Sequence, residues 1–347
     1  MKIETYMAMD IHHTHTVIEA QTPGGRVNFH RDVPTEPRYL TEAVKLGRGH
    51  KGVVIEEGPM ADWIMRVIKP YVAEVIICDP YRNRLICGDD EDKNDHLDPG
   101  NLINLYRTGQ LRMVHHPERQ SMMDLRRWVW LYCDQVELVT AAMNKIKAGY
   151  REEGIQYGQH DVYSPKGRMV WLSQLPRRKM VRDRMEGLYA NLDNLQNQRK
   201  SLNKNICRLA RRHPVTKRFL AIPGYREIRA MIFLVMVDTP FRFATARKLW
   251  RYGGLGLREK QTTNQENRKL GRTKRYNRRL KGVAKGAMET ALHLAKDNPF
   301  KTVYERLLQR GLPESLARLT IARKMLSVPW SMWKSGSDYN PALVGEC

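Results

Sequence analysis

A long stripe of apolar residues at helical spacing constrains the fold of this chain more than any other feature. Between residues 185 and 209 the apolar side chains recur three and four positions apart, and Arg199 occupies the one skipped position. The stripe consists of Met185, Leu188, Leu192, Leu195, Leu202, Ile206 and Leu209. A lone helix cannot bury such a stripe, so the pattern predicts a long helix that packs against another helix.

A second stripe supplies a partner for this helix. Residues 122–147 carry it at Leu125, Trp128, Tyr132, Val139 and Ile146. A polar segment over 154–166, with a glycine and a proline, connects the two. We expect a helical hairpin with coiled-coil packing, and the heptads leave open whether it pairs within one chain or between two.

The first 112 residues have the periodicity of an α/β domain. Short β-rich runs bounded by turn residues are Tyr6–Ile11, Thr14–Gln21, Arg26–Phe29, Val53–Glu56 and Glu74–Ile77. The first three follow one another closely, which favours an antiparallel meander. The helical pattern Ala61–Ile68 provides a crossover between a parallel fourth and fifth strand. This order of strands is that of the RNase H-like fold.

The chain is therefore predicted to be an α+β protein with several domains. We expect an RNase H-like domain over 1–112, a helical coiled-coil region over 113–212 and a small all-α domain over 213–330. Residues 331–347, rich in Gly, Ser, Asp, Asn and Pro from Ser335 on, are expected to form a loose tail.

The charge of the chain indicates a polyanionic partner. Its 347 residues include 60 Lys and Arg against 37 Asp and Glu, a net charge of +23. Such an excess favours binding to nucleic acid, because counterions are released from its phosphates, and an anionic membrane surface is the weaker alternative. No apolar run approaches the roughly 20 residues of a spanning helix and no signal peptide is evident, so we expect a cytoplasmic protein. The five scattered cysteines indicate neither a disulfide framework nor a zinc ribbon.

Carboxylates in the first domain indicate a site for divalent metal. Asp10 and Glu56 each end an apolar run, and Asp95 and Asp98 lie three apart at the start of a predicted helix, 98–105. Two strand-end acids and such a pair can meet around two metal ions, and hard oxygen ligands suit Mg²⁺ or Mn²⁺. The remaining acids are expected in a solvated loop: Glu57, Asp89, Asp90, Glu91 and Asp92.

Three segments of this domain resemble the DEDD-type transposases of the "one-ten" group of bacterial insertion sequences, relatives of the Piv DNA invertases. The segments are MAMDIHHTHTVIEA, VVIEEGPMADWI and DEDKNDHLDPGNL. The resemblance implies a RuvC-like domain whose catalytic, metal-binding acids are Asp10, Glu56, Asp95 and Asp98. It selects Glu56 over Glu57, although the family usually has alanine at the second position. His12, His13 and His15, next to Asp10, are expected to be polar surface residues.

A basic stretch in the third domain predicts a track for nucleic-acid phosphates. Nine cations without an acid are Arg268, Lys269, Arg272, Lys274, Arg275, Arg278, Arg279, Lys281 and Lys285. Asn277, within the stretch, supplies a polar contact. Upstream, the turn at Gly224 and Tyr225 can present backbone N–H groups to a phosphate, as in a helix-hairpin-helix element, and equally fits an ordinary turn between helices.

The third domain resembles, segment by segment, the transposase domain that ends members of the same family. The segments are IPGYREIRA, DTPFRFATARKLWRYGGLGLREKQ, GRTKRYNRRLKGVAKGA and PFKTVYERLLQRGLPESLARLTIARKML. The family carries a nucleophilic serine that forms a covalent link to a DNA phosphate, and Thr262 stands at the matching position. Threonine supplies the same hydroxyl, with an extra methyl group that crowds the attack.

These features favour a DNA transposase or site-specific recombinase that cleaves and rejoins strands through a covalent hydroxyl–phosphate intermediate. The resemblance also implies a bridge RNA as guide, a dimer or tetramer as the active form, and a place at the bacterial nucleoid. Two alternatives remain open. One is a Mg²⁺-dependent nuclease or junction resolvase in which water attacks, and the other is a catalytically decayed nucleic-acid binder.

Overall fold

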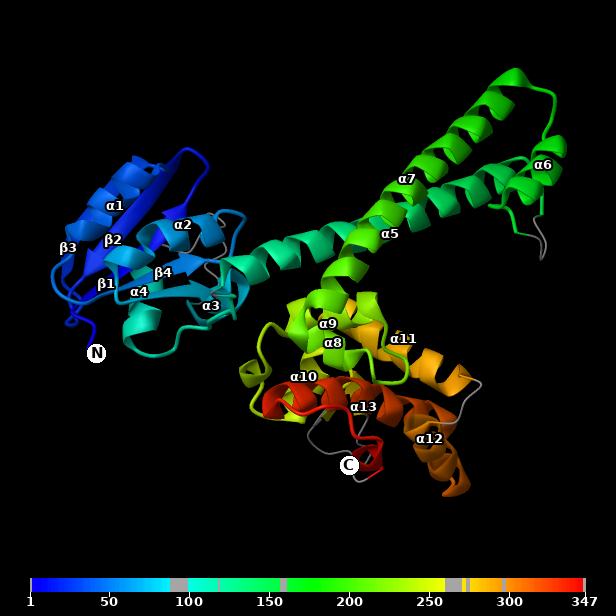
Figure 1. Ribbon diagram of the computed structural model, residues 1–347. Coiled ribbons are helices and arrows are strands. Elements are labelled where there is room, and N and C mark those ends of the chain that lie inside the picture. Colours follow the sequence, from blue (N-terminus) through cyan, green and yellow to red (C-terminus); the bar gives the residue numbers. More distant parts are fainter. Residues whose placement is uncertain are drawn as a thin grey trace, which may run out of the picture. The chain divides into compact units, whose positions relative to one another are not determined.

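The structure is a computed structural model that describes residues 2–87, 99–117, 119–156, 161–259, 270–272, 275–294 and 298–345. It consists of two compact units, Met1–His116 and Pro117–Cys347, and each is described by itself. The sequence pattern predicts three domains and a tail, whereas the structure joins the helical hairpin and the C-terminal helices in one unit (Figure 1).

A five-stranded mixed sheet forms the centre of the first unit. Its strands are β1 (Thr5–Ile11), β2 (His15–Gln21), β3 (Val27–Pro34), β4 (Lys51–Glu56) and β5 (Glu74–Cys78). They lie in the order β3-β2-β1-β4-β5, where β1, β2 and β3 are antiparallel and β4 and β5 run parallel to β1. The predicted meander followed by a parallel crossover is confirmed.

Helices cover both faces of this sheet. They are α1 (Pro37–Lys45), α2 (Ala61–Ile68), the short η1 (Lys69–Tyr71), α3 (Pro80–Cys87) and α4 (Pro99–Arg107). Met7, Ala8 and Met9 of β1 are all 0% exposed, which requires cover on both sides because successive side chains point to opposite faces. Ala8 packs with Leu102 and Ile103 of α4. The central strands β1 and β4 therefore lie between layers of helices on the two faces of the sheet.

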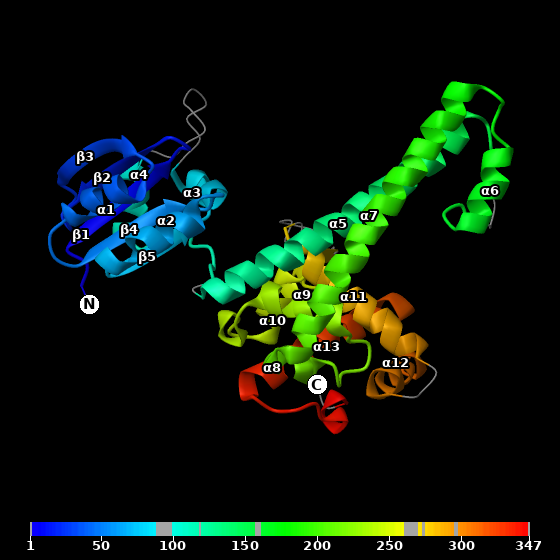
Figure 2. The same ribbon diagram turned by 45° about the horizontal axis from the view of Figure 1, so that its top comes forward.

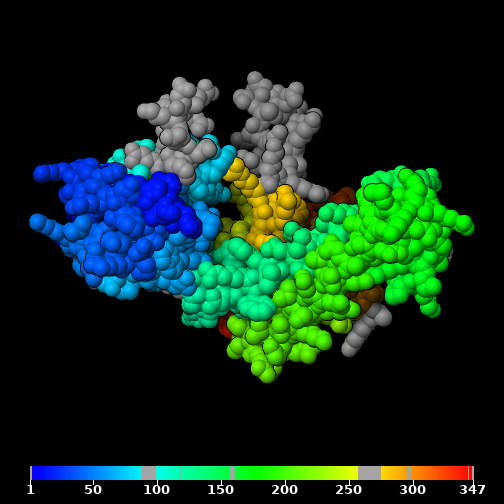
Figure 3. All heavy atoms as spheres, turned by 90° about the horizontal axis from the view of Figure 1, so that it is seen from above, coloured from blue at the N-terminus to red at the C-terminus, as the bar shows by residue number. Residues whose placement is uncertain are grey.

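Two long helices, α5 (Gln120–Glu152) and α7 (Lys179–Arg212), pack along each other in the second unit. The short helix α6 (Pro165–Ser173) lies near the end of this pair (Figures 1 and 2). Figure 3 shows α7 lying along α5 in the space-filling view. Val139 and Ile146 of α5 are buried together with Met185 and Leu192 of α7. The predicted pairing of two long helices is seen within the chain, and coiled-coil packing stays a prediction.

The rest of this unit is a helical bundle. Its elements are α8 (Pro214–Phe219), α9 (Glu227–Val237), η2 (Pro240–Arg242), α10 (Ala246–Tyr252), β6 (Leu257–Glu259), β7 (Leu270–Arg272), α11 (Arg278–His293), α12 (Pro299–Gln309), α13 (Glu314–Ser335) and η3 (Pro341–Val344). Helix α9 is the central helix, since its residues from Phe233 to Val237 are all buried. The domain is not purely helical as expected, because β6 and β7 pair as antiparallel strands.

The C-terminal segment packs against the bundle instead of forming the loose tail that its composition predicts. Helix α13 continues to Ser335, and Val344 is 1% exposed. The buried ammonium of Lys324 donates a hydrogen bond of 2.7 Å to the Val344 carbonyl. Arg218 donates to the carbonyl of Gly336 at 2.5 Å. Throughout the described ranges, every helix is too short or too polar to cross a lipid bilayer.

Candidate functional site

Two of the predicted catalytic acids leave the sheet at the same edge. Strands β1 and β4 are parallel neighbours in which Met9 pairs with Ile55, and Asp10 and Glu56 are the next residue on each strand. The carboxyl ends of adjacent parallel strands lie side by side, so the register brings the two acids to neighbouring positions. We call this pair of residues the carboxylate edge.

A third acid follows the adjacent strand, and sequence reasoning missed it. Cys78 of β5 pairs with Glu56, and Asp79 comes next in the chain. Asp79 Oδ1 accepts a 3.0 Å hydrogen bond from the Arg82 backbone N–H, and its Oδ2 lies 3.3 Å from Arg82 Nε. The sequence does contain a signal for Asp79, because this acid directly follows an apolar run, as Asp10 does. Its observed contacts hold the start of α3.

The thiol of Cys78 lies beside the carboxylate edge. Burial, followed by the nearby charge of Glu56, raises the pKa of this thiol to about 12.

A histidine joins the same edge. Nε2 of His12 lies 3.2 Å from Asp10 Oδ2, and the His12 ring stacks on that of His15 with centroids 4.4 Å apart. His12 is therefore not only a polar surface residue, as expected from the sequence. It holds the carboxylate of Asp10 on one side.

The other two predicted acids, Asp95 and Asp98, lie outside the described residues, as does the expected loop over 89–92. Within the described ranges, no group of three or more His, Cys, Asp or Glu side chains forms a metal site. Asp10 and Glu56 provide hard carboxylate oxygens, which fit Mg²⁺ or Mn²⁺. They could supply two of the ligands that such an ion requires.

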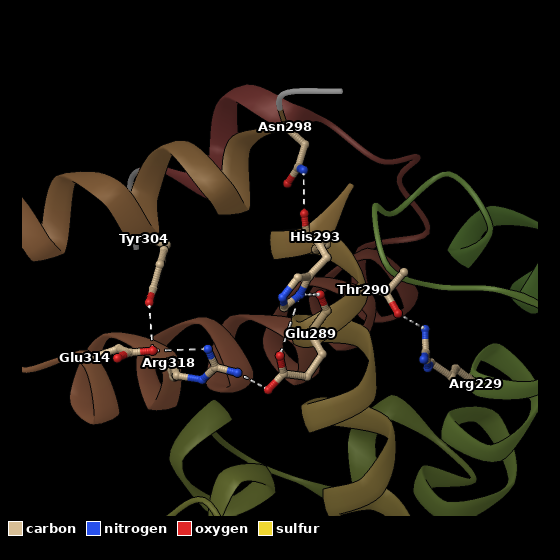
Figure 4. Close-up of polar contacts among 9 residues, drawn as sticks. Arg229, Glu289, Thr290, His293, Asn298, Tyr304, Glu314 and Arg318 are labelled. Atoms are coloured by element: carbon tan, nitrogen blue, oxygen red, sulfur yellow. Dashed lines mark hydrogen bonds and ion pairs between the residues drawn. The ribbon is translucent and has the colours of Figure 1, made fainter. Parts of the chain in front are cut away.

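The turn at Gly224 is held by packing between helices. Gly224 has φ +89°, and a Cβ atom at this position would lie 2.1 Å from the carbonyl oxygen of Ala287 in α11. Arg229 donates to the Gly224 carbonyl at 2.7 Å. It also donates to Thr290 Oγ1 at 2.9 Å (Figure 4). Partial burial lowers the pKa of Arg229. The glycine thus permits the turn to approach α11 closely.

Tyr225, predicted to contact nucleic acid, has its side chain in the core. It is 4% exposed, and its hydroxyl donates a 2.6 Å hydrogen bond to the Met325 carbonyl. Its ring packs edge-on against Phe219 and Phe233, with centroids 6.4 and 6.2 Å apart. The ring is therefore unavailable for stacking on a base, and only the backbone of the turn can make the predicted contact.

The residues of the predicted phosphate track have different surroundings in the structure. Thr262, Arg268, Lys269 and Lys274 lie outside the described residues, and so does the side chain of Arg272. Arg275 and Arg278 are exposed, as a phosphate contact requires. These two residues remain candidates for a contact with nucleic acid.

Asn277 and Arg279 form contacts within the protein. Asn277 caps α11 by accepting a 2.8 Å hydrogen bond from the Leu280 N–H. Arg279 binds Asp134 of α5 at 2.6 Å and lies over the Trp130 ring, 5.5 Å from its centroid. Asn277 therefore stabilises the N-terminus of α11, and Arg279 stabilises the contact of α11 with α5.

A small pocket lies beside the next part of the track. Its volume is about 190 Å³, and α11, α13 and the loop Gly254–Gly256 line it. Lys281 and Lys285 of α11 contribute to its wall. We call it the lysine pocket. Arg318 of α13, which also lines the pocket, forms ion pairs with Glu289 of α11 and with Glu314 (Figure 4).

Part of the second unit is similar to a known family. Residues 216–305, from α8 to α12, match the family model described as "Transposase IS116/IS110/IS902 family". This match and the relatives below agree with the resemblance to insertion-sequence transposases seen in the sequence, and more particularly with a transposase of the IS110 family.

Two curated relatives come from bacterial insertion elements. The chain is 28% identical over 155 residues to an uncharacterized 43.6 kDa protein of insertion element IS110 from Streptomyces coelicolor, a match that covers 44% of this chain and 37% of the relative. It is 29% identical over 133 residues to an uncharacterized 42 kDa protein of insertion element IS900 from Mycobacterium paratuberculosis, covering 38% and 33%. The chain thus matches roughly a third of the length of each relative.

Proposed function

We propose that this protein is a DNA transposase that cleaves and rejoins DNA strands by metal-dependent transesterification. One observation carries the proposal. A chain with a transposase domain at 216–305 also places Asp10 and Glu56 at neighbouring ends of parallel strands in a separate unit. The strand order β3-β2-β1-β4-β5 supports an RNase H-like, RuvC-like assignment for that unit.

The carboxylate edge is proposed to hold Mg²⁺ or Mn²⁺ together with Asp95 and Asp98. When bound, the ion would polarise the scissile phosphate and stabilise the leaving oxygen. His12, 3.2 Å from Asp10 Oδ2, keeps that carboxylate in one orientation.

The hydroxyl of Thr262 is proposed as the nucleophile. Its Oγ1 gives up its proton and forms a bond to phosphorus while the bond from phosphorus to a deoxyribose oxygen breaks, and the departing oxygen takes up a proton in exchange. The number of phosphoester bonds is unchanged, so a released DNA hydroxyl can reverse the step on the same or another strand. The extra methyl group of threonine predicts a slower attack than serine would give.

The partners follow from the charge and the family. DNA is the substrate, and a net charge of +23 suits binding to its phosphates. A structured bridge RNA is proposed as guide, since a protein that reads a helical backbone can leave sequence recognition to base pairing. The active form is proposed to be a dimer or tetramer at the bacterial nucleoid.

The test is incubation of the protein with Mg²⁺, guide RNA and DNA bearing the element's ends, followed by a denaturing gel. A covalent protein–DNA adduct is expected, lost in Thr262→Ala and enhanced in Thr262→Ser. Asp10→Asn removes a carboxylate at the edge and should abolish the adduct, whereas Asp32→Asn on the exposed strand β3 should not. Free nicks that persist in Thr262→Ala would identify a nuclease, and a mobility shift without cleavage would identify a binding protein.

A further inference from the structure

We propose that the lysine pocket binds one backbone phosphate of nucleic acid, held between Lys281, Lys285 and the first turn of α13. The inference deepens the proposed function and rests on it, because it names where the transposase domain grips its substrate. All residues that line the pocket belong to the second unit.

Two helix faces and a glycine-containing loop form the pocket. Lys281, Lys285, Met288 and Glu289 recur at i, i+4, i+7 and i+8 on α11, and Ser315, Arg318, Leu319 and Ala322 repeat a similar spacing on α13. Such spacings place each set on one side of its helix. The loop Gly254–Gly256 completes the wall and leads into the segment that carries Thr262.

The charges of the pocket favour an anion. Arg318 binds Glu289 and Glu314, with 3.3 Å between its Nη1 and Glu314 Oε1, so these three side chains together carry one negative charge. The two lysines exceed it and leave the group with one net positive charge for a ligand. Among the described residues, neither lysine has a carboxylate partner. Lys281 Nζ lies over the Tyr276 ring, 4.1 Å from its centroid, which positions the ammonium without neutralising it.

The first turn of α13 adds a second favourable feature. Ser315 is the second residue of this 22-residue helix and lines the pocket. The N-terminal end of a helix carries partial positive charge that favours phosphate. In α13 the N–H groups of Leu316 and Ala317 already donate to the Pro313 carbonyl, so the ligand meets the start of the helix at Ser315. Its Oγ can donate a further hydrogen bond. Lysines from one helix and the N-terminal end of another therefore face the same space.

The two lysines can reach the same ligand. Lys281 and Lys285 lie one turn apart on α11, where residues four positions apart are neighbours on one face, and both line the lysine pocket. The cavity, with a volume of about 190 Å³, has room for a phosphate group. The two lysines are therefore taken to act on one phosphate and not as separate positions along a track.

The experiment measures DNA affinity of the full chain against salt concentration with a duplex of random sequence. Each neutralised phosphate contributes about 0.9 to the slope of log K against log salt. The double variant Lys281→Gln/Lys285→Gln should lower the slope by about 0.9 and weaken binding about eightfold at 0.1 M salt, which is 10 to the power 0.9. Lys217→Gln/Lys334→Gln removes the same charge from exposed positions outside the pocket and should leave the slope nearly unchanged.

A variant that keeps both lysines tests the pocket itself. Ser315→Phe should block the space and give the same fall in slope, with circular dichroism melting as the check that the bundle is folded. A fall of about 1.8 in the lysine variant would show two separate contacts, and an unchanged slope or an equal fall in the control pair would show none specific to the pocket. Each of these results overturns the proposal.

Parallel titrations with duplex DNA and duplex RNA of equal length identify which backbone occupies the pocket, since the slope falls only for that ligand. Formation of the covalent adduct is scored separately in the wild-type protein. If the wild-type protein forms the adduct and the variants keep the wild-type salt slope, only the proposal for the pocket is refuted. Wild-type protein that binds duplex but forms no adduct refutes the proposed chemistry and leaves the pocket standing.

Discussion

Substitution of Gly224 by alanine tests how closely the turn before α9 approaches α11. The backbone at Gly224 has φ +89°, a region that residues with a Cβ atom rarely adopt. The new Cβ atom would also lie 2.1 Å from the Ala287 carbonyl oxygen and 3.0 Å from its carbonyl carbon. Both atoms are backbone in the middle of a helix, so relief requires a shift of α11 or of the turn itself.

The two costs can be estimated separately. An unfavourable φ costs about 1–3 kcal/mol, and a backbone shift of packed helices adds roughly 1–3 kcal/mol, as for overpacked cores. The free energy of unfolding should thus fall by about 2–6 kcal/mol. For a unit of this size, about 2–4 °C of melting temperature corresponds to 1 kcal/mol, so we expect a decrease of at least about 4 °C.

The assay is thermal unfolding followed by circular dichroism, with Gly282→Ala as the matched control. Gly282 lies within α11, and no atom stands within 4 Å of the position of its Cβ. Alanine there should stabilise the helix by about 0.5–1 kcal/mol. Opposite signs for the two variants support the reasoning. Equal melting temperatures, or a more stable Gly224→Ala, would show that the turn does not approach α11 as described.

Three further predictions concern buried or paired groups. Tyr225→Phe leaves the Met325 carbonyl without its donor and should cost about 1–3 kcal/mol in denaturant unfolding, with an unchanged mobility shift on DNA. Arg279→Gln should cost under about 1 kcal/mol, because Asp134 is exposed; a larger loss in the same assay would contradict this. Because folding raises the pKa of Cys78 from 9.0 to about 12, its contribution to stability is complete below pH 9 and falls as pH rises toward 12. Cys78→Ala should reduce that decline in melts at pH 8 and 10.

Local patterns predict most of the elements correctly. Helix α2 spans Ala61–Ile68 as expected, and each of the five strands appears where an apolar run stands. The expected third strand ends at Phe29, whereas β3 continues to Pro34. Most of its residues are exposed at the edge of the sheet, so it has no apolar alternation to reveal its length. Pairing with β2 extends it.

The arrangement of the carboxylate edge follows partly from the sequence pattern and partly from the register of the sheet. The sequence alone predicts that Asp10 and Glu56 follow apolar strands, and the register of β1 with β4 brings them together. Asp79 has the same signal after β5, yet its importance is visible only because Cys78 pairs with Glu56. Parallel strands are distant in sequence, so their order must come from packing.

Apolar periodicity and charge are enough to predict that this chain has an α/β unit, a long helical hairpin and a basic helical region. Which polar side chains remain available to a ligand depends instead on how the elements pack. Tyr225 and Arg279 are occupied by Met325 and Asp134, whereas Lys281 and Lys285 face the lysine pocket. The physical reason is that hydrogen bonds and burial depend on which elements meet, and residues far apart in the chain make those contacts.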